Sequence, residues 1–81
     1  MHDLDLLKGP RVVGTKQTLR VLENGTAKVL YVAKNAQKQV TLRVIELAES
    51  KSIPIVYIET MEELAQACDV EVKTATAALI T

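Results

Sequence analysis

Two short and almost wholly apolar segments, residues 29–33 and 55–58, constrain the fold of this chain more than any other feature. Both are rich in β-branched residues, a composition typical of strands buried on both faces of a sheet. Residues 37–51 lie between them and have a helical pattern, in which Val40, Val44, Leu47 and Ala48 form an apolar stripe. Alternating strands and helices of this kind predict an α/β fold, a three-layer α/β/α sandwich.

The rest of the chain supplies the other elements of such a sandwich. Leu42 and Ile45 are expected to broaden the apolar stripe of the helix over 37–51. The Thr60-x-x-Glu63 spacing predicts a capping box at the start of a later helix. Gly25 follows an amphipathic stretch and suits the end of a helix, because glycine tolerates positive φ. The other predicted helices are a short one over 3–8, one over 15–24 and one over 60–68. The other predicted strands run over 11–14 and 76–80.

Composition restricts the function classes that are open to the chain. The 81 residues are enough for one domain, 1–81, and the hydrophobic content of 48% suits a small aliphatic core without Phe or Trp. Cys68 is the only cysteine and His2 the only histidine. Cys68 lies in an apolar helical setting, where a free thiol packs as a small hydrophobic group. We therefore expect no enzyme activity, no metal site and no cofactor.

The distribution of charge is more informative than its sum. Ten basic and ten acidic residues give a net charge of zero, which counts against nucleic-acid binding by bulk charge alone. The basic residues gather in the first half and the acidic residues in the second, so one face can be positive. No apolar run reaches the ~18 residues of a membrane helix, and the acidic start lacks a signal pattern. We expect a cytoplasmic protein that does not bind membranes.

The segment 14–20 is the strongest candidate for a binding site. Gly14 can turn the backbone, and the Thr15 hydroxyl can cap the helix that follows. Lys16, Gln17 and Arg20 then fall together on the first turn and a half, on the polar side of that helix. Two cations beside an amide that both donates and accepts hydrogen bonds predict a nucleic-acid reading surface. An ordinary solvent-exposed helix face is the alternative reading of the same pattern.

Three segments of the chain are informative when they are taken together. The first is a G-x-K-Q-T-L-R string at a helix start, residues 14–20. The second is residues 29–36, which contain an A-x-N turn, and the third is residues 55–68. Together these segments resemble the kink-turn-binding ribosomal protein family, and most closely its small bacterial stand-alone members. The resemblance covers nearly the whole chain. Where the family often has glycines in the last helix region, this chain has Ala65 and Asp69. Where several archaeal and eukaryotic relatives have Asn-Glu, it has Lys16 and Gln17.

This resemblance implies a four-stranded mixed sheet and a partner of structured RNA, a kink-turn or kink-loop, with the ribosome as a further expected partner. In such RNA the G-x-K-Q residues would contact guanines of the sheared G·A pairs, and the loop from Glu59 to Leu64 would cover the bulged nucleotides. Lys34 would touch the backbone and Asn35 would brace the loop. Met61 and Ile58 could contact a bulged base or belong to the core. The expected RNA-binding residues are Gly14, Thr15, Lys16, Gln17, Arg20, Lys34, Asn35, Glu59, Thr60 and Met61.

Two alternatives to RNA binding stay open at this point. A neutral, glutamate-bearing surface on the same scaffold also suits a protein–protein interaction module, since one fold hosts many functions. A small enzyme is the weakest alternative, because no base, metal cluster or phosphate loop is recognisable. Glu59, Glu62 and Glu63 lie close to the expected RNA surface. We therefore expect weaker RNA binding than in more basic relatives, by a protein that acts as a monomer.

Overall fold

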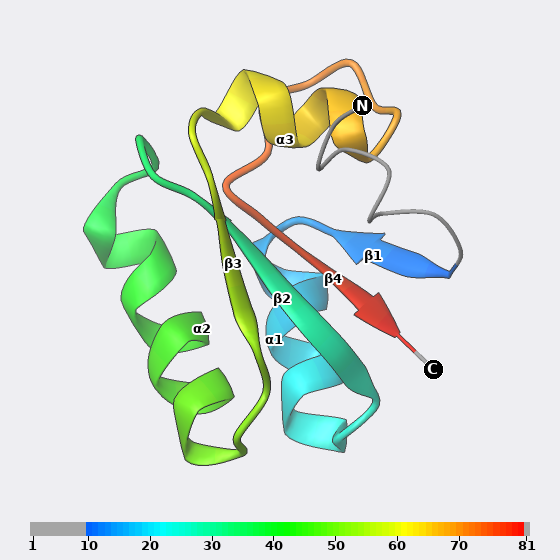
Figure 1. The fold of residues 1–81 in the computed structure, drawn as a ribbon, viewed down its shortest axis with the longest axis vertical. Helices are drawn as coiled ribbons and strands as arrows, with labels where there is room; N and C mark the ends of the chain where they lie inside the picture. Colours follow the sequence, from blue (N-terminus) through cyan, green and yellow to red (C-terminus); the bar gives the residue numbers. More distant parts are fainter. Residues whose placement is uncertain (1–9, 81) are drawn as a thin grey trace.

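The computed structural model describes residues 10–80 and contains three helices and four strands in that range (Figure 1). The helix predicted over 3–8 lies outside the described residues. The predicted bounds agree closely with the observed elements, which are β1 (Arg11–Val13), α1 (Thr15–Asn24), β2 (Ala27–Ala33), α2 (Lys38–Ser50), β3 (Ile55–Ile58), α3 (Met61–Ala67) and β4 (Thr76–Ile80).

The four strands form one mixed sheet in the order β1-β4-β2-β3. β2 and β3 are parallel, with Tyr31 opposite Val56, whereas β4 is antiparallel to both β1 and β2. The parallel pair is joined through α2, the crossover that parallel strands require. β4, the last of the four strands, lies between β1 and β2 in the sheet. The loop before β4 therefore lies at the end of a central strand.

The helices cover both faces of the sheet, which confirms the three-layer sandwich. Neighbouring residues of a strand point to opposite faces, and β2 shows this clearly. Leu30 and Val32 pack in one cluster with buried residues of α1 and α2. Tyr31 packs in the other cluster with Leu64 of α3 and with Cys68. Cys68 is therefore a core residue, as its apolar setting predicted.

Local chain signals explain where several helices begin and end. Gly25 has φ 78° and ends α1 in the left-handed conformation, as predicted. The Thr60 side chain accepts a hydrogen bond from the Glu63 N–H at 3.0 Å and caps α3. The cap predicted from Thr15 is wrong. Gly14 holds the capping position of α1 with no side-chain bond, and Thr15 is already helical.

Two predictions of burial are also wrong, and the strand order explains one of them. β3 was expected to be buried on both faces, but it has a neighbour on one side only, and Tyr57 is 50% exposed. Leu42 was expected to widen the buried stripe of α2 but is 55% exposed. Thr41 is buried instead, and its hydroxyl donates to the Gln37 carbonyl at 3.5 Å.

Candidate nucleic-acid interface

Most of the predicted site residues lie along the side of the sheet that is formed by strand ends, where β2 and β3 end and β4 begins (Figure 1). This side is the edge of the candidate interface. Backbone hydrogen bonds hold the segments of this edge together. The Gly14 N–H donates to the Thr76 carbonyl at 2.9 Å, and the Lys34 N–H donates to the Ile58 carbonyl at 2.8 Å. The start of α1, the turn after β2 and the loop after β3 thus become neighbours.

The start of α1 owes its shape to a glycine. Gly14 has φ 99° and ψ 150°, a conformation that side chains of L-residues disfavour. A Cβ built there would meet no atom within 4 Å, so the backbone angle rather than crowding requires glycine. The Gly14 carbonyl accepts the Thr18 N–H at 2.9 Å and begins the helix. The Thr15 hydroxyl accepts from the Thr76 hydroxyl at 3.3 Å and anchors this turn to β4.

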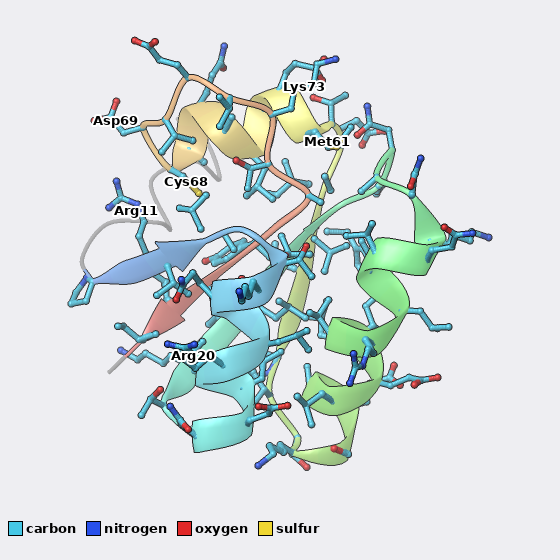
Figure 2. All side chains as sticks on the ribbon, turned by 180° about the vertical axis from the view of Figure 1, so that it is seen from behind. Arg11, Arg20, Met61, Cys68, Asp69 and Lys73 are labelled. Carbon is cyan, nitrogen blue, oxygen red and sulfur yellow. The ribbon has the colours of Figure 1, made fainter. Side chains whose placement is uncertain are left out.

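The polar side chains of α1 point to solvent, as predicted. Lys16, Gln17 and Arg20 are exposed, whereas Thr18 and Val21 are buried on the other side of the helix. Lys16 and Arg20 are one turn apart and therefore share a face. The first turn of α1 contains no acidic residue of its own, and the positive end of the helix dipole favours a nearby anion there. Figure 2 shows Arg20 on α1, well away from Met61.

The turn after β2 is tied to the loop after β3 by two side chains. The Asn35 Oδ1 accepts the Met61 N–H at 2.8 Å, so Asn35 braces the start of α3, as predicted. Lys34 Nζ donates to Glu59 Oε1 at 3.3 Å in an exposed ion pair. Lys34 is therefore held by a carboxylate of the same surface, a contact that the sequence did not reveal.

Ile58 and Met61, which had two open interpretations, differ in the structure. Ile58 is 6% exposed and belongs to the core. Met61 is half-buried and packs against the edge of the same cluster. Met61 can therefore offer part of its surface to a ligand, and Ile58 cannot.

The segment 69–75, between α3 and β4, was missed by the sequence analysis. The Thr74 N–H donates to the Met61 carbonyl at 3.3 Å, which brings this loop to the same edge. Lys73 pairs with Glu62 at 3.6 Å, and Val72 is 69% exposed. No local signal marked this segment, because a lone exposed apolar residue such as Val72 is ordinary on a protein surface.

Arg11 fixes the point from which this loop departs. Its Nη2 and Nε donate to the Cys68 carbonyl at 2.7 and 3.3 Å, so β1 holds the end of α3 (Figure 2). Asp69 follows in the left-handed conformation, with φ 62°. Burial raises the pKa of the Cys68 thiol, and the nearby Arg11 charge partly opposes that change. The thiol is thus protonated and inert near neutral pH.

The described residues offer little to other kinds of site. Among residues 10–80, no group of three or more His, Cys, Asp or Glu side chains is placed to hold a metal ion. Within the same range, no helix combines the length and apolar character needed to cross a bilayer.

Comparison with known proteins places the chain in a family. Residues 7–81 match the model of the ribosomal protein L7Ae/L30e/S12e/Gadd45 family. The chain belongs to this family. The resemblance inferred from residues 14–20 and the two later segments is thereby confirmed.

Individual members of the family are similar over most of the chain. A protein named as an RNA-binding protein from Caldanaerobacter subterraneus subsp. tengcongensis is 47% identical over 68 residues, which are 84% of this chain and 83% of that one. The large ribosomal subunit protein eL8 of Haloquadratum walsbyi is 37% identical over 83% of this chain and 57% of its own length. Among solved structures, the Giardia lamblia 15.5kD RNA binding protein superposes with a TM-score of 0.83 at 26% identity. That match covers 89% of this chain and 61% of the Giardia protein.

Proposed function

We propose that this protein is a non-catalytic RNA-binding protein that recognises kink-turn or kink-loop RNA. Membership of the family and the names of its relatives support RNA binding as the general function. The observation that carries the proposal is the exposed Lys16, Gln17 and Arg20 at a helix start beside a braced turn. Association with the ribosome and a cytoplasmic location are further parts of this proposal.

The shape of RNA explains why a helix start of this kind would need a kinked partner. The major groove of regular A-form RNA is too deep and narrow for side chains to read base edges. A sharp bend with non-Watson–Crick G·A pairs opens the groove locally. A helix start at Gly14, which has no side chain, could then approach the exposed purine edges.

Each exposed side chain has a chemical role in this proposal. The Lys16 ammonium can donate to O6 and N7 of guanine. Gln17 can donate and accept at a base edge. Arg20, one turn further on, can bind a phosphate or a base, and the N–H groups after Gly14 favour a phosphate.

The second part of the site would cover the unpaired nucleotides of the kink. Thr60 and Met61 begin α3, and Asn35 holds that start against the turn after β2. Val72 adds an exposed apolar group from the neighbouring loop. A half-buried methionine and an exposed valine suit contact with an unstacked base, whereas Lys34 and Lys73 suit the phosphates around it.

Substitution of Lys16 tests the proposal directly. Lys16→Ala should weaken binding of a kink-turn RNA by ~1–3 kcal/mol, about 5- to 150-fold, if the side chain reads a base. Lys28→Ala is a matched control, because Lys28 is exposed near the amino end of β2, at the opposite end of that strand. Binding is measured by gel shift at a stated salt concentration, with an RNA whose G·A pairs are disrupted as the second control.

The pattern of affinities separates the competing explanations. Equal affinity of wild type and Lys16→Ala would remove Lys16 from the reading surface. Equal affinity for the intact and disrupted RNAs would remove kink recognition. Failure to bind either RNA, together with co-purification of a stable protein partner, would favour an interaction module.

A further inference from the structure

The flank formed by α2 and β3 carries apolar side chains that no other element in the range 10–80 covers. Leu42 is 55% exposed and Tyr57 is 50% exposed. Together with Ile45 they line a groove of about 260 Å³ between the helix and the edge strand. Figure 1 shows α2 and β3 at one margin of the molecule, with no labelled element beyond them.

Four residues of α2 form a stripe along this flank: Lys38, Leu42, Ile45 and Glu49. At about 100° per residue they fall within an arc of roughly 60°. Lys38, Leu42 and Ile45 line the groove, and Glu49 is exposed on the same arc. The residues that α2 buries against the sheet, Thr41, Val44 and Ala48, lie on a different arc. The stripe is therefore positive at its amino end, apolar in the middle and negative at its carboxyl end.

This stripe is complementary to itself when one copy is reversed. The midpoint between Lys38 and Glu49 and the midpoint between Leu42 and Ile45 both fall between residues 43 and 44. A twofold axis through that point places Lys38 opposite the partner's Glu49, and it places Leu42 opposite the partner's Ile45. Each contact occurs twice, as in any interface with this symmetry. A parallel arrangement would instead place like charges together.

From this pattern we infer that the α2 stripe is a docking surface for a second copy of this chain, with the two α2 helices antiparallel. Among the described residues, neither Lys38 nor Glu49 is in an ion pair of its own chain, so both are available to a partner. The two lysines that line the groove, Lys34 and Lys38, would attract the phosphates of an RNA, so RNA as the occupant is one outcome of the test below. The charge order favours the chain itself over an unrelated protein.

The surface is too small for a stable interface. The stripe spans about 16 Å along a helix about 10–12 Å wide, an area of roughly 160–190 Å², and Tyr57 is the one large exposed apolar side chain that β3 adds to it. This area is well below the ~800 Å² per partner of a stable interface. The dimer is consequently weak, with a Kd of about 0.1–1 mM, and the chain is monomeric when dilute. The antiparallel arrangement points the two proposed RNA-binding edges in opposite directions, and Lys34 belongs both to such an edge and to the lining of the groove.

Reversal of the two charges gives a sharp test, in sedimentation equilibrium of the full chain without RNA. The weight-average mass of the wild type should rise toward that of a dimer as its concentration approaches about 1 mM. Lys38→Glu and Glu49→Lys should each weaken association at least tenfold, because like charges then meet at both ends. An equimolar mixture of the two variants should associate again, because opposite charges meet at both ends of the mixed pair.

Two further variants complete the test. Leu42→Ser removes the apolar centre and should abolish association. Arg43→Glu is the matched control, because Arg43 is exposed on the side of α2 that faces α1. It makes the same charge change as Lys38→Glu and should leave the stripe intact. Circular dichroism establishes that each variant is folded.

Three results would overturn the inference. The first is a wild type that stays monomeric at all concentrations. The second is a mixture of the two charge variants that associates no better than either alone. The third is a wild type that stays monomeric while Leu42→Ser lowers the affinity for RNA. That result would assign the groove to RNA. Because the association assay contains no RNA, its outcome is independent of the proposed RNA-binding function.

Discussion

Asn35 connects the two halves of the candidate interface, and its removal should cost measurable stability. The Oδ1 of Asn35 accepts the Met61 N–H at 2.8 Å. Met61 is the first residue of α3, so this N–H has no partner within the helix. A net hydrogen bond is worth about 0.5–1.5 kcal/mol, and water can replace part of this exposed one. Asn35→Ala should lower the free energy of unfolding by about 0.5–1 kcal/mol, which corresponds to a Tm decrease of about 2–8 °C for a domain of this size.

Asn35→Asp separates the structural role from the electrostatic one. Aspartate keeps an oxygen for the Met61 N–H and should unfold at nearly the wild-type urea concentration. Its negative charge next to the proposed RNA surface should nevertheless weaken kink-turn binding. Gln37→Ala is the control, because Gln37 precedes α2 without a side-chain capping bond. If Asn35→Ala and Gln37→Ala have the same unfolding midpoint as the wild type, the brace contributes nothing and the reasoning is refuted.

Two other predictions concern the scaffold. Gly25→Ala should destabilise the protein by about 1–2 kcal/mol in urea unfolding, because alanine disfavours a φ of 78°. The cost should not be larger, because the added Cβ would meet no atom within 4 Å. An unchanged midpoint would contradict this backbone argument. The raised pKa of the Cys68 thiol predicts that stability falls as pH rises above 9.0, because the unfolded state then releases this proton before the folded state does. Cys68→Ala should remove that part of the pH dependence, and identical pH profiles for the two proteins would count against it.

The elements could be predicted from sequence because their signals are local. The polar arc of α1, the Gly25 ending and the Thr60 cap each depend on residues within a turn or two, and all three are present. Thr15 was assigned the capping role because its residue type suits that position. In the structure Gly14 occupies that position with φ 99°, which suits glycine, and the next residue, Thr15, contacts Thr76 instead.

Burial and long-range contacts were harder to predict because they depend on strand order. An apolar segment such as Ile55–Ile58 has the same composition in the centre and at the edge of a sheet, and only the pairing shows that Tyr57 is exposed. The bonds of Lys34 and Asn35 to the loop after β3 join residues 25 and 26 positions apart. The segment 69–75 reaches the same edge only because β4 inserts between β1 and β2.

Electrostatic pairing within the candidate interface leads to one more prediction, about Glu59. The Lys34–Glu59 pair is exposed on both sides, with side chains 55% and 69% accessible, so it contributes at most about 1 kcal/mol to stability. RNA that binds Lys34 must displace this carboxylate. Glu59→Gln should therefore raise the affinity for kink-turn RNA, by up to about fivefold, with little change in stability.

The salt dependence of binding reveals whether Lys34 has been released. A lysine freed for phosphate should make log K fall more steeply with log salt, by about one unit of slope. Glu46→Gln makes the same charge change on the exposed side of α2, beside Leu19 of α1, and should alter neither quantity. A decrease in affinity with Glu59→Gln would show instead that the carboxylate itself contacts the RNA. Glu59 would then be a base-reading group rather than a competitor for Lys34, and the neutral net charge of the chain would reflect specific recognition by acidic as well as basic side chains.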